Sequence, residues 1–210
     1  LYTDRPIGKY RIMESTEIIL NKAEKLFADS GFGSVSMTSI ANACKMSKAN
    51  LYHHFSSKED LYTQILTRAQ KNTQNILEKT KEISGTYIEK IEFFINEHLN
   101  QMLKDPMKYK LLAREFSDLG FTSRAMPSVG LMEQNLSQIV NLIDQAKNNN
   151  EIIEDTNSRL LAYQLLSPNL TYITHQNLFD SVFEGLGPSS NESFSKTLTN
   201  NLLRGVKQND

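Results

Sequence analysis

Two adjacent histidines, His53 and His54, lie in the lysine-rich stretch SKANLYHHFSSKEDL at residues 47–61. Histidine is a common metal ligand and a common general acid or base. Neighbouring side chains on a helix point about 100° apart, so this pair is poorly placed to bind one metal ion. The other histidines, His98 and His175, are isolated, and the sequence has neither an HExxH motif nor a pair of cysteines. The sequence therefore predicts no metal site and no cofactor.

Glycine-rich and nucleophile motifs of enzymes are also missing from the sequence. The nearest glycine cluster, GFGSVS at residues 31–36, matches neither a phosphate-binding loop, a dinucleotide fingerprint nor a nucleophile elbow. It follows a predicted helix and not a strand, which favours a simple loop between helices. A helical metallohydrolase is supported only by four scattered histidines. We predict that the protein is not an enzyme.

The distribution of charge points to a different chemistry for the histidine-containing stretch. The whole chain has 24 acidic residues and a net charge of −1, yet no Asp or Glu lies between Ser30 and Lys58. Lys45 and Lys48 fall inside this window. DNA phosphates attract lysines and repel carboxylates, so an acid-free segment with lysines suits DNA contact. The plainer alternative is a surface that simply lacks acids.

The elements that must position these residues are helices, because apolar residues recur at helical spacing and two-residue alternation is nearly absent. The pattern predicts a helix over 11–29 that stops at Gly31, then two short helices capped by Ser36 and Ser47. A long helix follows, with a capping box that begins at Ser56 or Ser57. The two short helices and the turn at residues 44–46 form a helix-turn-helix candidate, whose second helix can enter a major groove. The hydroxyls of Ser36, Thr38 and Ser47 suit phosphate contacts.

Longer helices are predicted after a break at residues 84–86. Pro168 is expected to kink or interrupt one of them, and residues 183–191 resemble a linker. The predicted segments are 88–102, 106–116, 131–146, 155–178 and 190–206. The fold class is therefore all-α with about nine helices, divided into an N-terminal unit at 1–57 and a larger unit at 58–210.

Residues 23–62, AEKLFADSGFGSVSMTSIANACKMSKANLYHHFSSKEDLY, resemble the N-terminal DNA-binding domain of the tetracycline-repressor (TetR) family. The matching features are the AxxLFxxxGF end of the first helix, the IA pair of the second, SKxxLYxHF, and the SKExL start of the fourth. The resemblance extends over about residues 11–62. Beyond it, the chain matches the family only in the number and length of its helices.

The resemblance implies DNA contacts at the start of the second helix, on the third helix and at the start of the fourth. The residues expected to bind DNA are Ser36, Met37, Thr38, Ser47, Lys48, Ala49, Asn50, Tyr52, His53, His54 and Lys58. For His54, a half-buried ring that packs at the junction of the third and fourth helices is an alternative. Two residues depart from the family pattern. Lys45 stands where glycine is common, which costs about 1 kcal/mol if its backbone is left-handed. Ala49-Asn50 replaces a common Gly-Thr pair, and Asn can pair with adenine.

The same resemblance implies an effector pocket and a dimer interface in the larger unit. Candidate pocket residues are aromatic, sulfur-containing or histidine side chains: Phe94, His98, Met102, Phe116, Phe121, Met132, Tyr163, Tyr172 and His175. Ordinary core packing is the alternative for each of them. Candidate interface residues on the last two long helices are Leu161, Leu165, Leu198 and Leu202, which alternatively close the core of the monomer.

The predicted function is sequence-specific, DNA-binding regulation of transcription by a homodimer. The favoured version is a repressor that a small, largely apolar effector releases from a palindromic operator. The alternative is an activator or a chromosome-organising protein without an effector. The single cysteine, Cys44, and the lack of an apolar run of about 18 residues favour a cytoplasmic protein with no membrane segment.

Overall fold

The computed structural model describes residues 7–117, 126–182 and 191–207. These residues form nine helices and confirm the all-α prediction. The helices are α1 (Ile7–Ser34), α2 (Met37–Ala43), α3 (Lys48–His54), α4 (Lys58–Lys81), α5 (Tyr87–Lys104), α6 (Pro106–Ser117), α7 (Met126–Asn148), α8 (Ser158–Val182) and α9 (Asn191–Arg204). Across the described ranges, no helix combines the length and apolar character that a membrane span requires. Residues 183–190 of the candidate linker at 183–191 lie outside the described residues, and Asn191 begins α9.

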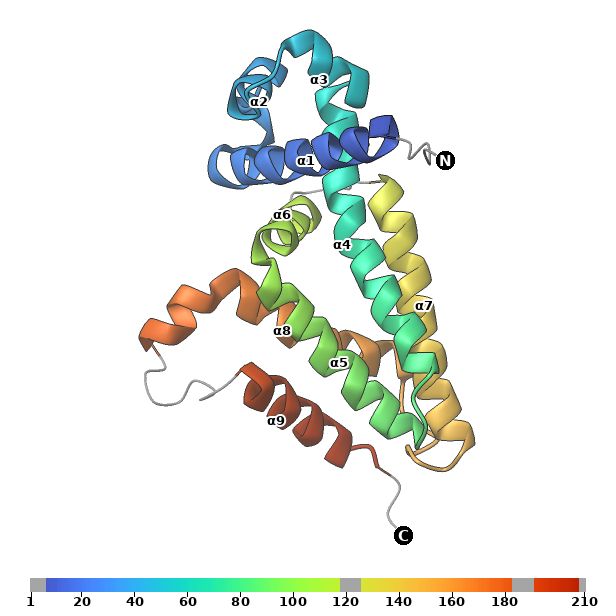
Figure 1. Cartoon of the computed structure of the whole chain (residues 1–210). Coiled ribbons are helices and arrows are strands. Elements are labelled where there is room, and N and C mark those ends of the chain that lie inside the picture. The colour runs from blue at the N-terminus through green and yellow to red at the C-terminus, as the bar shows by residue number, and fades with distance from the viewer. Residues whose placement is uncertain (1–6, 118–125, 183–190, 208–210) are drawn as a thin grey trace, which may run out of the picture.

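The helices are arranged around α4, which runs from the end that carries α1, α2 and α3 to the opposite end of the molecule (Figure 1). Along its length α4 packs against α1, α5, α6 and α7. Helix α9 packs against α5 and α8. The α2–α3 pair lies at one extremity of the fold, with α1 between it and the larger helical unit (Figure 1). The division at residues 57 and 58 coincides with the start of α4 and remains a prediction.

Local capping signals set the helix starts, as the sequence predicts. The Ser36 hydroxyl accepts a hydrogen bond from the Ser39 backbone N–H, and the Ser47 hydroxyl accepts one from the Asn50 N–H. The cap of α4 is Ser57, whose hydroxyl accepts from the Asp60 N–H at 3.0 Å. Each of these bonds satisfies one of the N–H groups that a helix start leaves unpaired.

The kink in α8 lies at His175 and not at Pro168, so the predicted position is wrong. Pro168 is inside the helix, whereas His175 has non-helical angles of φ −119° and ψ 20°. The His175 Nδ1 atom lies 3.1 Å from the Thr171 carbonyl oxygen and 2.8 Å from the Thr174 hydroxyl. These side-chain contacts compete with the backbone hydrogen bonds of the helix at that turn.

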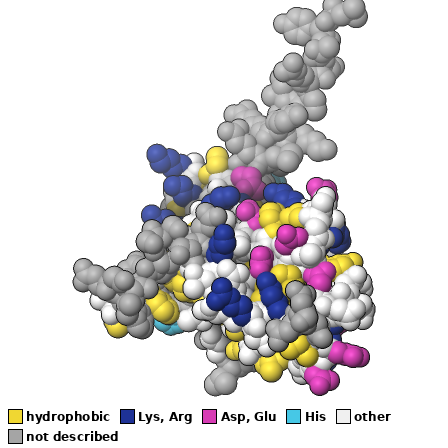
Figure 2. All heavy atoms as spheres, turned by 90° about the horizontal axis from the view of Figure 1, so that it is seen from below, with side chains coloured by type: hydrophobic (Ala, Val, Ile, Leu, Met, Phe, Trp, Pro, Cys, Tyr) yellow, Lys and Arg dark blue, Asp and Glu magenta, His cyan; other side chains and the backbone are white. Residues whose placement is uncertain are grey.

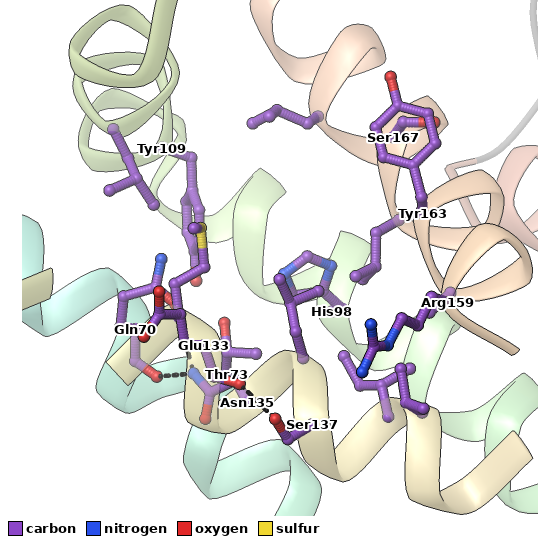
Figure 3. Close-up of a pocket in the computed structure, with 18 of the residues that line it drawn as sticks. Gln70, Thr73, His98, Tyr109, Glu133, Asn135, Ser137, Arg159, Tyr163 and Ser167 are labelled. Atoms are coloured by element: carbon purple, nitrogen blue, oxygen red, sulfur yellow. Dashed lines mark hydrogen bonds between the residues drawn. The ribbon is translucent and has the colours of Figure 1, made fainter. Parts of the chain in front are cut away.

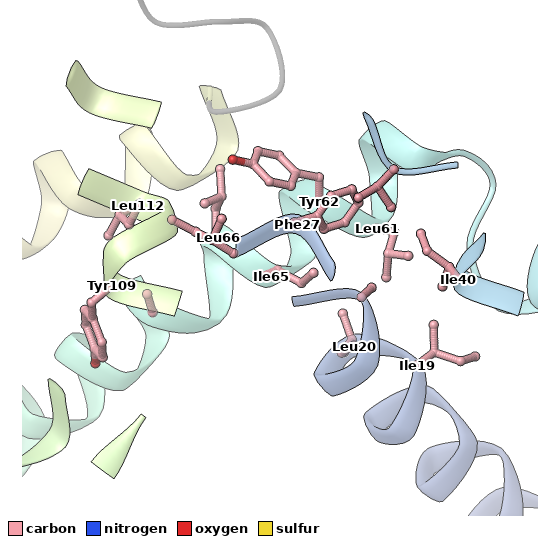
Figure 4. Close-up of a cluster of buried hydrophobic side chains, with 14 of the residues drawn as sticks. Ile19, Leu20, Phe27, Ile40, Leu61, Tyr62, Ile65, Leu66, Tyr109 and Leu112 are labelled. Atoms are coloured by element: carbon pink, nitrogen blue, oxygen red, sulfur yellow. The ribbon is translucent and has the colours of Figure 1, made fainter. Parts of the chain in front are cut away.

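One hydrophobic core continues from the helix-turn-helix into the larger unit (Figure 4). Its buried residues come from α1, α2 and α3, from the first half of α4, and from α5, α6, α7 and α8. Within it, Phe27 of α1 meets Tyr62 of α4 edge-on, with ring centroids 5.0 Å apart. A second cluster fills the far end of the molecule between α4, α5, α7, α8 and α9. Helix α3 is therefore anchored, through Leu51, to the same packed interior as the helices of the larger unit.

A buried carboxylate lies where α1 meets the α5–α6 junction. Glu24 is 5% exposed and is adjacent to Asp105 and Lys108, which form an ion pair with each other. Burial, and then the charge of Asp105, raise the pKa of Glu24 from 4.5 to about 7. Lys108 and Arg68 oppose this shift. The contact between α1 and the larger unit therefore depends on a carboxyl group that holds its proton near neutral pH.

Substituting glycine at Lys45 should stabilise the fold. Lys45 has a left-handed backbone, φ 54°, in a turn where its N–H bonds to the Asn42 carbonyl and the Met46 N–H bonds to the Ala41 carbonyl. A side chain disfavours this conformation. Lys45→Gly should raise the free energy of unfolding by about 1 kcal/mol in urea titrations. The control Ala43→Gly, in the helical part of α2, should lower it by about 0.5–1 kcal/mol. A loss of stability in Lys45→Gly would contradict the prediction.

Neutralising Glu24 should remove a pH dependence of stability. Its folded pKa is raised above the unfolded value, so its stabilising protonated state is complete below pH 4.5 and is lost as the pH rises through about 7. Glu24→Gln should therefore raise the free energy of unfolding at pH 8 by on the order of 1 kcal/mol or more. The gain should shrink towards pH 5, where the wild-type carboxyl is largely protonated. Denaturant titrations at the two pH values provide the measurement, and an equal effect at both would refute the assignment.

Candidate DNA-binding surface and ligand cavity

The helix-turn-helix has one packed face and one exposed face. Ile40 and Ala41 of α2 and Leu51 of α3 are buried, and Phe55 just after α3 is 1% exposed. These residues hold the two short helices in the core that they share with α1 and α4. The opposite face of α3 is solvent-exposed and lies within the acid-free window.

Most of the residues expected to bind DNA lie on the exposed surface of this unit. They are Ser36, Thr38, Ser47, Lys48, Ala49, Asn50, Tyr52 and His53. The Lys48 ammonium lies 5.9 Å from the centre of the Tyr52 ring, one turn further along α3, and Tyr52 is 46% exposed. This pair presents a cation, a phenol and an aromatic edge together, which suits contact with phosphates and bases.

Three other candidates point inward and have structural roles. Met37 is 7% exposed and shares the buried face of α2 with Ile40, three residues further on, so its side chain is unavailable for base contact. The half-buried His54 lies with Nδ1 3.1 Å from the Thr16 hydroxyl of α1, in agreement with the packing alternative. Lys58 donates two hydrogen bonds of 2.9 Å, to the Phe32 and Val35 carbonyls.

Lys58 therefore contacts the last turn of α1. Gly31 has the left-handed φ that the sequence predicts, 77°, but it kinks α1 and does not end it, because the helix continues to Ser34. The Lys58 ammonium also lies 4.2 Å from the centre of the Phe32 ring. It fixes α1 to the start of α4 and leaves one N–H donor for any phosphate. In contrast to the acid-free window, the face at the far end of the molecule mixes basic, acidic and hydrophobic side chains (Figure 2).

A cavity of about 1020 Å³ lies between α4, α5, α6, α7 and α8 (Figure 3). Its volume is at the upper end of the range for small-molecule sites. The lining is mainly apolar, with a few polar groups. The lining residues are Gln70, Thr73, His98, Met102, Tyr109, Leu112, Met132, Glu133, Asn135, Leu136, Ser137, Ile139, Val140, Arg159, Ala162, Tyr163, Leu166, Ser167 and Leu170.

Four of the predicted pocket residues line this cavity: His98, Met102, Met132 and Tyr163. Phe94 is buried behind it and stacks on the His98 ring with centroids 5.6 Å apart. Tyr172 is a core residue that stacks on Phe194, and His175 is exposed at the kink of α8. None of these three is among the residues that line the cavity. The side chains of Phe116 and Phe121 lie outside the described residues.

Sequence reasoning missed the polar lining residues Gln70, Thr73, Asn135 and Arg159. Two of them, Gln70 and Thr73, are polar residues within the apolar stripe of α4, and this interruption of the stripe is a sequence signal for them. They are 6% and 7% exposed. The Asn135 side chain donates hydrogen bonds to the Gln70 carbonyl at 3.0 Å and to its side-chain oxygen at 3.2 Å. The bonds join α7 to α4 at the cavity wall.

The titratable groups deep in the cavity are electrically neutral. His98 is 8% exposed, and burial lowers its pKa to about 4, so its imidazole is uncharged at neutral pH. Burial raises the pKa of Tyr109 to about 12, which keeps its phenol protonated. The charged lining residues, Glu133 and Arg159, are exposed at the rim. Within the described ranges, no three His, Cys, Asp or Glu side chains come together as a metal site.

The predicted interface residues have different environments. Leu161 and Leu165 are each 2% exposed in the core of the protomer, in agreement with the monomer-core alternative. Leu198 and Leu202 of α9 are half-buried, and Leu202 packs on the second core cluster. The exposed apolar residues of α8 are Leu160, Tyr163, Leu178 and Val182.

Comparisons with known proteins agree with this architecture. Residues 19–65 match the family described as bacterial regulatory proteins, tetR family. The chain is 30% identical over 160 residues to the HTH-type transcriptional regulator UidR of Escherichia coli K12, covering 73% of this chain and 76% of UidR. It is 28% identical over 81 residues to IcaR of Staphylococcus aureus Newman, the negative transcriptional regulator of a biofilm operon, covering 39% of this chain and 44% of IcaR.

A solved structure shares the fold over most of the chain. FadR of Bacillus subtilis, in complex with stearoyl-CoA, superposes with a TM-score of 0.74 and 17% identity, covering 90% of this chain and 98% of FadR. The helix-turn-helix, the nine-helix architecture and the match to UidR lead to one conclusion. The chain belongs to the TetR family and is a helix-turn-helix, DNA-binding transcriptional regulator.

Proposed function

We propose that the protein is a cytoplasmic repressor that binds a palindromic operator as a homodimer and leaves it when a small, largely apolar molecule occupies the cavity. The cavity of about 1020 Å³ is the observation that carries the effector part of this proposal. A cavity of this volume argues against the alternative of a DNA-organising protein that has no effector. The negative regulation named for IcaR supports repression, and the stearoyl-CoA bound to FadR supports a ligand in this fold.

The effect of a bound ligand can reach the DNA-binding unit through a packed core that this unit shares with the cavity. Met102, Tyr109 and Leu112 line the cavity and also belong to the core that contains Phe27 of α1 and Ile65 of α4. A ligand that contacts these side chains favours one arrangement of α5 and α6, and α6 packs directly on α1. The ligand shifts the operator equilibrium to the extent that it binds the two arrangements with different affinity.

The outward stripe of α8 supplies the proposed dimer contact. Leu160 and Tyr163 are 53% and 67% exposed, and Leu178 and Val182 are 54% and 61% exposed. Leu160 and Tyr163 lie three residues apart before the kink at His175, and Leu178 and Val182 lie four residues apart after it, so each pair shares one face of its part of α8. Leu160 is one position out of phase with the buried Leu161. Pairing this face with a second copy places two α3 helices on one DNA molecule, with half-sites about one turn, or about 34 Å, apart.

Alanine at Lys48 or Tyr52 should weaken operator binding without unfolding the protein, because both side chains are exposed on α3. The operator is first selected from a randomised DNA pool with the wild-type protein, and affinities are then measured by fluorescence anisotropy. Each variant should lose about 1–3 kcal/mol of binding free energy. Lys48→Ala should also reduce the slope of log affinity against log salt concentration by about 1, because one phosphate contact is lost.

Lys196→Ala is the matched control, since this exposed lysine lies on α9, far from α3 in the fold. Its operator affinity should equal that of the wild type. Equal affinities for Lys48→Ala and Lys196→Ala, with thermal melts that show both proteins folded, would rule out α3 as the reading element.

A further inference from the structure

The deep wall of the cavity has polar atoms without partners. His98 and Asn135 are 8% and 3% exposed, and both line the cavity. No described residue hydrogen-bonds to the Nδ1 atom of His98 or to the side-chain oxygen of Asn135. Figure 3 shows the His98 ring, from α5, directed into the space between α4, α7 and α8. A buried polar atom without a partner is costly, so these two atoms are recognition points for a ligand.

Neither recognition point is paired with a charge. Burial keeps the His98 imidazole neutral, and Asn135 and the neighbouring Gln70 carry no charge. A carboxylate or an ammonium group brought to this wall loses its hydration without gaining a counter-ion. A hydroxyl group both donates and accepts a hydrogen bond, so it can donate to the Asn135 oxygen and accept from His98 in the tautomer that is protonated at Nδ1.

The rim of the cavity has the opposite character. Arg159 of α8 and Glu133 of α7 line it and are exposed. An anionic end of a ligand therefore has its favourable position at the rim, beside Arg159, where water also solvates it. The walls between rim and deep wall are largely aliphatic and include Leu136, Ile139 and Leu166.

We infer that the effector is a molecule with an apolar body whose inner end carries an uncharged hydroxyl group, held by His98 and Asn135, and whose charged end, where it has one, stays at the rim with Arg159. This inference rests on the proposed function for the view that the cavity holds the effector. It deepens that proposal by fixing the polarity and orientation of the ligand.

Three twelve-carbon probes test the inference: 12-hydroxydodecanoate, dodecanoate and dodecanedioate. They share one carboxylate for the rim and differ at the far end, which is a hydroxyl, a methyl or a second carboxylate. Dissociation constants are measured by titration calorimetry on the full-length protein without DNA, below the micelle concentration of each probe. In the wild type, 12-hydroxydodecanoate should bind at least about tenfold more tightly than dodecanedioate.

The ratio of the dodecanoate and 12-hydroxydodecanoate dissociation constants isolates the hydroxyl contact. His98→Phe keeps the ring stack on Phe94 and should reduce this ratio by about tenfold. Asn135→Leu should reduce it as well and provides the comparison if His98→Phe does not fold. His175→Phe, a change of an exposed histidine outside the cavity lining, should leave the ratio as in the wild type.

The inference is overturned if the folded cavity variants keep the wild-type ratio, if dodecanedioate binds as tightly as the hydroxy acid, or if none of the probes binds. These measurements do not involve DNA. Hydroxyl selectivity without any effect of ligand on operator affinity therefore contradicts the proposed function and leaves the assignment of the cavity intact.

Discussion

The structure depends on the packing of the first half of α4 between the helix-turn-helix and the larger helical unit. Leu61 and Ile65 are fully buried among residues of α1 and α2, and Leu66 and Ala69 continue the same core towards α5 and α6. Because interiors are close-packed, a displacement of one side of such a core is felt on the other. The orientation of α3 is therefore tied to the arrangement of helices around the cavity.

Polar contacts at the edge of this core fix how the helices are placed relative to one another. Lys58 fastens the end of α1 to the start of α4, and Glu24 faces Asp105 and Lys108 where α5 passes into α6. Both are buried or half-buried polar groups whose partners lie on other helices, so they favour one relative placement of those helices more strongly than hydrophobic contact alone. The exposed face of α3 and the cavity are thus joined by one core. Its inside is apolar, and polar contacts at its edges fix the relative placement of the helices.

Sequence reasoning recovered the features that depend on local chemistry. Ser36 and Ser47 cap their helices because a hydroxyl at that position meets a nearby N–H, and the left-handed backbone of Gly31 follows from the same kind of short-range rule. The inward role of Lys58 was missed because its acceptors are 23 and 26 residues away. The sequence predicts Leu161 as an interface residue, whereas the structure buries Leu161 and exposes its neighbour Leu160, because one residue turns a side chain by about 100° on a helix. The cavity wall formed by His98 and Asn135 depends on helix packing that periodicity does not encode.

Native-state hydrogen exchange tests the shared core most directly. Amides at residues 23–27 of α1 and at residues 95–99 of α5 lie on the two sides of α4 and have buried side chains in both segments. If one core couples the helix-turn-helix to the cavity, both sets should exchange with the same opening free energy, equal to that of global unfolding. Opening of residues 23–27 at a distinctly lower free energy than residues 95–99 would show two independent units and contradict the account.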